Sequence, residues 1–430
     1  MVEANSHDRE RTMSTRAACR NALVLPAIAL LLGACASSQT PAPDKPERIG
    51  RAQDLYELSP AYQPGTYRHM DELFFTRTVH RGPKVYPLPA GAEVPVKYSV
   101  DGQLVGVEAF MRRNQVGGVL IIKDGKIALE KYAMGNDAST RWTSFSVVKS
   151  ISSTLVGAAV QQGSIASVKD PLTRYLPQLK GGAYDGVSVE QMLQMSSGAA
   201  WDETYRDPKS DRRRMFELQL ANNPGALLKQ MSGLKRAHAP GTAFAYSTGE
   251  SHLQSELVRA ATGMTTSDYL SERIWARLGM ERDAFWQLDS RAGQEIGSSG
   301  LSATLRDYGR FGQFILDDGV IDGERILPAG WLASATRATP GSHLEPGKLY
   351  DGEYALGYGY QWWLFPTGAA ALPEHGGGAF EAQGIFGQFL YINPKENIVA
   401  VVWSTWPKPE MDEREMETYA FIGAAVKALR

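Results

Sequence analysis

Two short motifs in this chain carry residue types and spacing suited to nucleophilic chemistry. Each is Ser-x-x-Lys: Ser146 with Lys149, and Ser232 with Lys235. A serine hydroxyl becomes a nucleophile when a neighbouring base takes its proton, and an uncharged lysine can be that base. With this composition about one such match is expected by chance, so the flanking sequence has to distinguish the two.

The sequence after Ser146 favours the first motif. Residues 146–162 have the apolar spacing of a helix, whereas Ser232 stands next to a glycine and before the turn residues Pro240-Gly241, which predicts a loop. At a helix start, the Ser146 N–H has no partner within the helix and can donate to a developing oxyanion. Lys149 would lie on the same helix face, one turn further on.

The position of Lys149 also predicts a lowered pKa. The positive end of the helix dipole and burial between two lobes both disfavour the ammonium form. An uncharged Lys149 could then take the proton of Ser146. The same residues would equally suit a serine that caps a helix beside an exposed lysine, and the motif alone leaves both interpretations open.

Two further segments could complete such a site. Tyr246 lies between a Pro-Gly turn and a predicted helix, so its hydroxyl could relay a proton between nucleophile and leaving group. The alternative is a core tyrosine whose hydroxyl is satisfied. The segment 380–388 runs into a predicted strand and contains Gly384 and Gly387. Glycines permit close backbone approach, so an N–H at this strand edge could be the second oxyanion donor.

Six segments, taken in order, resemble the serine β-lactamase and penicillin-binding-protein superfamily, and most of all its branch of 6-aminohexanoate-dimer hydrolases and carboxylesterases. The resemblance extends from about Asp71 to Lys427. Ordered matches of this kind are far more specific than any single motif. The segments are Ser144–Ser150, Met195–Gly198, Trp201–Tyr205, Phe244–Ser247, Gly300–Asp307 and Gly384–Gln388.

The resemblance implies roles for individual residues. Ser146 would be the acylated nucleophile, Lys149 its base and Tyr246 the proton relay. The amides of Ser146 and Ile385 would form the oxyanion hole. Tyr205 matches a tyrosine that closes over the substrate on a mobile loop in the amide-hydrolysing members. The implied fold is the β-lactamase/transpeptidase-like α+β fold: an α/β sandwich with an antiparallel sheet flanked by helices, plus an all-helical lobe.

Two motifs depart from the β-lactamase pattern. Where β-lactamases carry Tyr-x-Asn, this chain has Tyr246-Ser247-Thr248. Where they carry Lys-Thr-Gly, Ala382-Gln383-Gly384 stands in register, so Gln383 and Gly384 are the expected substrate-binding positions. The missing lysine would hold the carboxylate of a β-lactam, and we therefore expect little penicillin turnover. An alternative register puts His375-Gly376-Gly377 there, but only the first register also aligns Gly387-Gln388.

The elements that must position these residues follow from hydrophobic periodicity. Apolar runs over 118–122 and 127–132 flank Asp124-Gly125, which predicts a β-hairpin. Residues 50–115 are weakly periodic and predict a wrapping segment. Strands near both ends, with a helical lobe over about 160–290 inserted between them, predict one sheet and a cleft at the junction. The other predicted strands span 358–364, 388–392 and 398–403, and the predicted helices span 146–162, 189–195, 215–220, 253–261, 266–278, 305–316 and 413–429.

The first residues predict export. Two arginines precede a short apolar stretch, and Leu32-Gly33-Ala34-Cys35 resembles a bacterial lipobox. Cys35 would carry lipid, and Ala36 provides no signal for retention at the inner membrane. We therefore expect a lipid-anchored protein of the bacterial cell envelope, at the outer membrane and facing the periplasm; an ordinary secretory signal is the alternative. The expected domains are a lipoprotein signal peptide over 1–34, a flexible tether over 35–50 and a hydrolase domain over 51–430.

Composition and missing motifs exclude several classes of function. A net charge of −2 leaves no basic surplus for a nucleic acid. The chain has no Gly-x-Ser-x-Gly elbow, and no His-Glu-x-x-His or cysteine cluster that would suggest a metal. We predict a serine hydrolase, without cofactor or metal, that cleaves an ester or linear amide bond of a small-molecule or short-oligomer substrate through an acyl-enzyme at Ser146. A cell-wall D,D-peptidase or weak β-lactamase is the alternative, and a catalytically inactive lipid-anchored binding protein is the second.

Overall fold

The structure is a computed structural model that describes residues 47–349, 356–367 and 374–430. Residues Glu47–Arg430 form one unit. The predicted signal peptide, Cys35 and most of the predicted tether lie outside the described residues. No helix in the part of the chain that the structure describes is long and apolar enough to cross a membrane.

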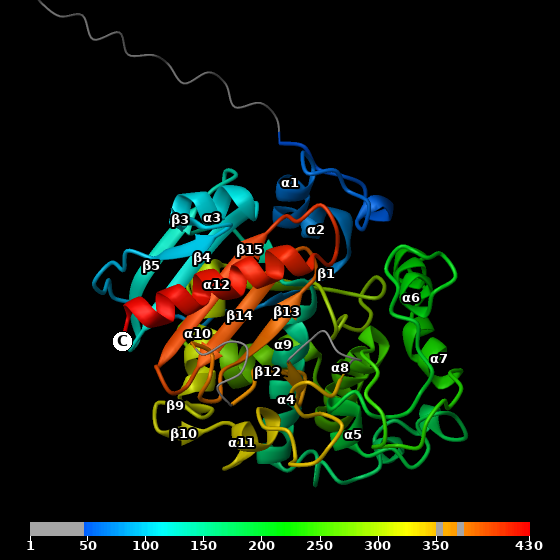
Figure 1. The fold of residues 1–430 in the computed structure, drawn as a ribbon. Coiled ribbons are helices and arrows are strands. Elements are labelled where there is room, and N and C mark those ends of the chain that lie inside the picture. The colour runs from blue at the N-terminus through cyan, green and yellow to red at the C-terminus, as the bar shows by residue number, and fades with distance from the viewer. Residues whose placement is uncertain (1–46, 350–355, 368–373) are drawn as a thin grey trace, which may run out of the picture. The chain divides into compact units, whose positions relative to one another are not determined.

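An antiparallel sheet of seven strands joins the two ends of this unit (Figure 1). Its order is β11-β12-β13-β14-β15-β4-β5, so the pairing of β15 with β4 places the last strand beside the β4–β5 hairpin, as predicted. The strands are β4 (Val116–Lys123), β5 (Lys126–Tyr132), β11 (Gly357–Tyr358), β12 (Trp363–Leu364), β13 (Phe380–Gly384), β14 (Gln388–Asn393) and β15 (Ile398–Ser404).

The predicted hairpin is confirmed by the pairing of β4 with β5. Lys123 lies opposite Lys126 across a two-residue turn. Asp124 and Gly125 both have positive φ, 51° and 72°. Two such residues form the turn whose twist matches that of the flanking strands, which explains why Asp-Gly is found there.

The two faces of the sheet pack against different helices. Along β4, Val119 and Ile121 join the apolar cluster that includes α12 (Asp412–Ala428) and α3 (Val107–Arg113). Leu120 and Ile122 join the cluster that includes α10 (Leu305–Leu316). Figure 1 shows α12 lying across one face, with α10 on the other. Because successive strand residues point to opposite sides, this alternation produces one helical layer on each face.

A second, smaller sheet delivers the chain to the predicted nucleophile. It has the strand order β1-β7-β8-β6, and all its pairs are antiparallel. The last of these strands, β6, ends three residues before Ser146. The strands are β1 (Thr76–Val79), β6 (Trp142–Thr143), β7 (Ala284–Gln287) and β8 (Leu301–Ala303); two-stranded ribbons are formed by β2 (Lys97–Val100) with β3 (Gln103–Gly106) and by β9 (Val320–Ile321) with β10 (Glu324–Arg325).

Every predicted helix is present, with shifted ends in most cases. The α10 boundaries match the prediction, whereas the predicted helix over 266–278 is α9 followed by one π-helical turn over Ser271–Trp275. Ser232, predicted to lie in a loop, is instead the last residue of α7, and its hydroxyl donates to the carbonyl of Lys229 at 2.9 Å. The remaining helices are α1 (Gln63–Arg68), α2 (Met70–Leu73), α4 (Val148–Gln162), α5 (Val189–Leu193), α6 (Asp211–Leu220), α7 (Ala226–Ser232), α8 (Thr248–Thr262), α9 (Thr266–Leu270) and α11 (Trp331–Ala335).

One strand prediction was wrong in detail, and one strand was not predicted. The segment 358–364 is a tight hairpin of β11 and β12, because Gln361 adopts a φ of 65° and reverses the chain. Its side-chain amide donates to the carbonyl of Leu193 at 2.8 Å, which fixes the reversal. The strand predicted over 388–392 is confirmed as β14, and the unpredicted strand is β13, which pairs with β14 in a second hairpin. Residues 385–387 therefore form a turn, which is where Ile385 lies.

Candidate active site

Ser146 lies in a short 3₁₀ turn, Phe145–Val147, between β6 and α4. The α-helix begins only at Val148, two residues after the predicted start at Ser146, and the Ser146 side chain does not cap the helix. Phe145 has a φ of 44°. Its ring packs against Tyr67 at 5.1 Å and Phe386 at 5.4 Å between centroids. A backbone conformation of this kind persists where packing over-determines it, and such positions cluster at functional sites.

Lys149 reaches back to Ser146, as the spacing predicts. Its Nζ lies 2.9 Å from Ser146 Oγ, 3.1 Å from Thr248 Oγ1 and 2.8 Å from the carbonyl oxygen of Ser298. The side chain is only 2% exposed. The amine is therefore held by three neighbours in a site that excludes water.

Burial lowers the pKa of Lys149 to about 7. The nearby Glu203 carboxylate raises this pKa, and the guanidinium of Arg212 lowers it. A pKa near neutrality leaves a large fraction of the amine uncharged at the pH of most cells, which is the condition for a general base. The arrangement can thus remove the proton of the Ser146 hydroxyl.

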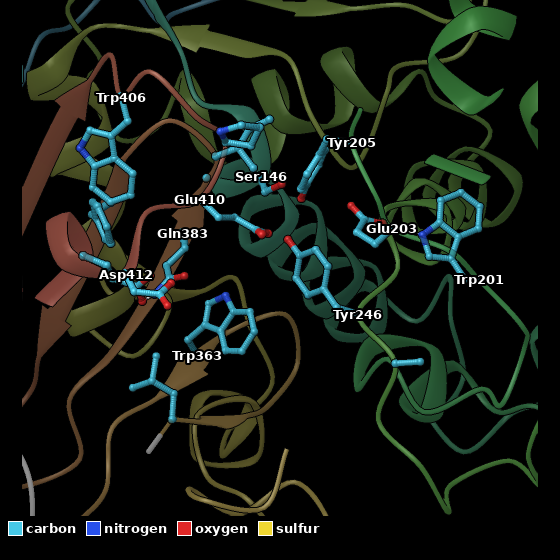
Figure 2. Close-up of a pocket in the computed structure, with 17 residues that line it drawn as sticks. Ser146, Trp201, Glu203, Tyr205, Tyr246, Trp363, Gln383, Trp406, Glu410 and Asp412 are labelled. Atoms are coloured by element: carbon cyan, nitrogen blue, oxygen red, sulfur yellow. Dashed lines mark hydrogen bonds between the residues drawn. The ribbon is translucent and has the colours of Figure 1, made fainter. Parts of the chain in front are cut away.

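A cavity of about 590 Å³ opens beside Ser146 (Figure 2). Among the residues predicted for the site, Ser146, Tyr205, Tyr246, Gln383, Gly384 and Ile385 all line it. Lys149 does not; it lies behind Ser146, in contact with its hydroxyl. The other lining residues are Trp201, Glu203, Ala245, Leu356, Trp363, Phe389, Trp406, Pro409, Glu410, Asp412 and Glu415.

Tyr246 lines the cavity and lies two residues before α8. Its ring stacks on Trp363 at 5.7 Å between centroids and with 18° between the planes. The Nζ atom of Lys149 lies 5.3 Å from the ring centroid. Figure 2 shows the hydroxyl end of the ring turned toward the Ser146 side of the cavity, where a proton relay would have to act.

Gly384 brings the end of β13 against the turn that carries Ser146. A Cβ atom at this position would lie 2.5 Å from the carbonyl oxygen of Ser144 and 3.1 Å from the amide nitrogen of Ser146. Only glycine allows so close an approach without a shift of the backbone. The next residue, Ile385, also lines the cavity. Ser146 and Ile385 thus both line the cavity, close to the point where β13 meets the Ser146 turn.

His375 does not take the place of the missing lysine. It is 1% exposed, and its ring nitrogens pair with the hydroxyl of Tyr391 and the carbonyl of Tyr419, both at 3.0 Å. Burial lowers its pKa to about 4, so the ring is neutral. It is not among the residues that line the cavity. The register that places Ala382-Gln383-Gly384 beside the serine is the one observed.

Tyr205 and Gln383 are held by neighbouring side chains. The Tyr205 ring lies 5.8 Å from that of Tyr56, and burial raises the pKa of its hydroxyl well above 10, so the phenol stays protonated. Gln383 Nε2 lies 2.7 Å from Glu381 Oε1 and 3.0 Å from Glu415 Oε1. The amide of Gln383 therefore connects β13 to α12.

Four carboxylates line the cavity, and the motifs predicted none of them as functional: Glu203, Glu410, Asp412 and Glu415. Glu203 lies inside one of the matched segments, but nothing in the sequence pairs it with Thr248. The other three follow β15 and begin α12, far along the chain from Ser146. The described residues that line the cavity include no lysine, arginine or histidine, so its wall is acidic.

No group of three or more histidine, cysteine, aspartate or glutamate side chains is arranged to hold a metal ion within residues 47–349, 356–367 and 374–430.

The family model for Beta-lactamase matches residues 106–425. This protein belongs to the beta-lactamase family. The match runs from α3 into α12, and so includes the seven-stranded sheet, the four-stranded sheet apart from β1, and the whole of the candidate site.

Relatives of this beta-lactamase family member include hydrolases of several kinds. The 6-aminohexanoate-dimer hydrolase of Paenarthrobacter ureafaciens is 29% identical over 354 residues, which cover 80% of this chain and 86% of the relative. A Bacillus anthracis structure assigned as a 6-aminohexanoate-dimer hydrolase has a TM-score of 0.75 at 23% identity, and covers 90% of this chain and 98% of its own. A family VIII carboxylesterase has a TM-score of 0.57 at 18% identity, and covers 75% and 95%. The predicted β-lactamase/transpeptidase-like fold is confirmed, and the protein is a hydrolase of this family.

Proposed function

We propose that this protein is a serine hydrolase that cleaves an ester or linear amide bond through an acyl-enzyme on Ser146. The observation that carries the proposal is the 2.9 Å contact between Lys149 Nζ and Ser146 Oγ. It combines a nucleophile at the wall of a cavity with a buried base whose pKa is about 7. These are the requirements for an activated serine.

In the proposed mechanism, the Ser146 oxygen attacks the carbonyl carbon while its proton passes to Lys149. Negative charge develops on the carbonyl oxygen, which the amides of Ser146 and Ile385 would stabilise. Tyr246 would pass the proton on to the departing alcohol or amine. Water then attacks the acyl-enzyme by the reverse route and releases the acid.

The relatives support both bond types. The name of the Paenarthrobacter relative describes a hydrolase of a 6-aminohexanoate dimer, and that of a structural neighbour a carboxylesterase. A cavity of about 590 Å³ suits a small molecule or a short oligomer. Tyr205, Gln383 and Gly384 line it and are the proposed substrate contacts.

The electrostatics of the cavity argue against the alternative functions. The substrates of β-lactamases and D,D-peptidases present a carboxylate, and this cavity presents four carboxylates of its own with no lining cation among the described residues. Juxtaposed like charges are unfavourable. A catalytically inactive binding protein would not need the Ser146–Lys149 contact or its buried amine.

Labelling with a fluorophosphonate, followed by mass spectrometry, tests the proposal. We expect one adduct on Ser146 and loss of turnover of p-nitrophenyl esters in Ser146→Ala. Ser232→Ala, in the second Ser-x-x-Lys motif, is the matched control and should be labelled and active as the wild type is. An adduct on Ser232, or undiminished turnover by Ser146→Ala, would overturn the assignment.

We also propose, on the sequence alone, that the mature protein is a lipoprotein anchored through Cys35 in the outer membrane and faces the periplasm. The signal peptide and Cys35 lie outside the described residues, so this part of the proposal depends on the lipobox-like segment.

A further inference from the structure

Thr248 connects the amine of Lys149 to a carboxylate. On one side, Lys149 Nζ lies 3.1 Å from Thr248 Oγ1. On the other, Thr248 Oγ1 donates to Glu203 Oε1 at 2.5 Å. Glu203 is placed by two further bonds to its Oε2, from the amide of Thr248 at 2.9 Å and from Trp201 Nε1 at 2.5 Å. Glu203 and Thr248 are 45 residues apart in the sequence, and the Thr248 hydroxyl oxygen contacts both Glu203 and the proposed base.

The direction of these hydrogen bonds follows from the chemistry of the groups. An ionised carboxylate only accepts hydrogen bonds, so the Thr248 hydroxyl must donate its single proton to Glu203. The oxygen of that hydroxyl then faces Lys149 as an acceptor. On the other side of Nζ, the carbonyl oxygen of Ser298, at 2.8 Å, can also only accept.

An uncharged lysine has two N–H bonds and one lone pair. The two acceptors, Thr248 Oγ1 and the Ser298 carbonyl, take the two N–H bonds. The lone pair is left for the third neighbour, Ser146 Oγ, at 2.9 Å. If Thr248 could turn its hydroxyl proton toward Lys149, it would compete with Ser146 for that lone pair.

We propose that Glu203 is a positioning residue for the general base: through Thr248 it directs the lone pair of Lys149 at the hydroxyl of Ser146. The inference rests on the proposed function, since it concerns the same serine and lysine. During acylation the Ser146 O–H bond breaks, an N–H bond forms on Lys149 and the serine oxygen bonds to the carbonyl carbon. The resulting Lys149 ammonium has three N–H bonds, one for each of the same three acceptors. The negative charge of Glu203 stabilises the positive charge of this ammonium.

A purely structural role for Glu203 is the competing explanation. Thr248 is the first residue of α8, so the bond from its amide to Glu203 also satisfies an unpaired N–H at a helix start. In that case the loss of Glu203 would lower stability without changing how Lys149 titrates, and its effect would not depend on the Thr248 hydroxyl.

A double-mutant cycle separates the two explanations. We expect Thr248→Val to lower kcat roughly ten- to a hundredfold with little change in KM, because the interaction acts on the base and not on bound substrate. Thr248→Ser, which keeps the hydroxyl, should stay within a few-fold of wild type. Glu203→Gln combined with Thr248→Val should be about as slow as the slower single variant, because both changes break one chain of hydrogen bonds.

The pH dependence of kcat/KM is a second test, because a purely structural role of Glu203 would leave it unchanged. Glu203 raises the pKa of Lys149 and Arg212 lowers it, while Tyr246 presents its ring to the amine. Removing the Glu203 charge therefore lowers the Lys149 pKa further, and the acidic limb of kcat/KM should move to lower pH in Glu203→Gln. Glu410→Gln is the matched control. It removes another carboxylate of the same cavity, should leave that limb in place and should combine additively with Thr248→Val.

Fluorophosphonate labelling of the wild-type enzyme is done first, because failure to label Ser146 would refute the proposed function and not this inference alone. With Ser146 labelled, additive losses in the cycle or an unmoved acidic limb in Glu203→Gln would overturn the role of Glu203. If a Glu203 variant does not fold, the comparison of Thr248→Val with Thr248→Ser still decides, since equal activity of the two contradicts the proposal.

Discussion

Lys149 is the residue whose chemistry depends most on its surroundings. In water its amine would be charged at neutral pH, and burial brings its pKa to about 7. The same burial that creates a base also removes the alternative of an exposed lysine next to a capping serine. The proposed function therefore depends on where this one side chain lies.

The activity of the wild-type enzyme should rise with pH through the pKa of Lys149, near 7, because only the uncharged amine accepts the serine proton. Lys149→Ala should lower kcat/KM by roughly 10²–10⁴-fold, as is typical for the loss of a general base. Initial rates on p-nitrophenyl butyrate between pH 5 and 9 would measure both effects. A Lys149→Ala variant within a few-fold of wild type contradicts the role.

Stability should carry the signature of the same buried amine. Between the folded pKa of about 7 and the ordinary value of 10.5, the unfolded chain binds a proton that the folded chain does not. The free energy of unfolding therefore rises with pH across this window, and below about pH 7 the contribution has been lost. Lys149→Met has no amine at this position, so its free energy of unfolding lacks this rise with pH. The difference in free energy of unfolding between the variant and wild type should therefore shrink from pH 7 to 10. Urea unfolding at several pH values measures the difference; a constant difference would argue against an uncharged buried amine.

At the scale of elements, the active-site wall depends on how closely two of them meet. The turn that carries Ser146 leaves β6 with Phe145 at a φ of 44°, and the end of β13 lies directly beside it. Neither element forms an oxyanion site alone. Ser146 and Ile385 line one cavity, and β13 comes this close to the turn because Gly384 has no side chain to hold the strand away.

Gly384→Ala should therefore lower activity far more than it lowers stability. The added Cβ would lie 2.5 Å from the Ser144 carbonyl, so strand and turn must move apart. Displacements of about 1 Å at a catalytic site can cost on the order of 10²-fold in rate, and we expect a kcat reduced roughly ten- to a hundredfold. Gly106→Ala, where the nearest atom is 3.7 Å away, is the control and should be unaffected in steady-state kinetics. Normal kcat in Gly384→Ala would contradict the proposed oxyanion wall.

At the scale of the whole described unit, the cavity combines residues from the Ser146 turn, from two loops of the helical part of the chain, from β12 to β14, and from the segment that leads into and begins α12. Its acidic lining comes from two distant parts of the chain, around Glu203 and around Glu410 to Glu415 (Figure 2). The charge of the site is thus a property of the assembled fold, and it bears on which substrates can enter.

Purified protein should cleave p-nitrophenyl butyrate with a higher kcat/KM than nitrocefin. The carboxylate of nitrocefin finds no lysine at position 382 or 383 and meets an acidic wall. The loss of a charge-assisted hydrogen bond of this kind costs roughly 1.5–3 kcal/mol, or about one to two decades in kcat/KM. Parallel assays of the two substrates on wild type and Ser146→Ala make the measurement. Nitrocefin as the better substrate would mean that another cation holds its carboxylate.

Full-length protein expressed in a bacterial host should be processed to a form that begins at lipid-modified Cys35. We expect globomycin to block this maturation and the mature protein to fractionate with the outer membrane. Cys35→Ala is the informative variant, since it should abolish lipidation and leave the hydrolase activity unchanged. A soluble wild-type protein with an unmodified N-terminus would support an ordinary secretory signal instead.

The sequence by itself determined the features whose signals are local or ordered along the chain. Ser146 and Lys149 are three residues apart, the β4–β5 turn carries its own Asp-Gly, and the ordered motifs identified the family and its fold. Only the tertiary structure decided which distant groups complete the site. Thr248 and the Ser298 carbonyl contact the Lys149 amine, and Glu203 reaches it through Thr248, because helices and loops pack together there. Periodicity and spacing report on neighbours along the chain; they carry no information on contacts between remote segments, and such contacts set the burial of Lys149 and the charge of the cavity.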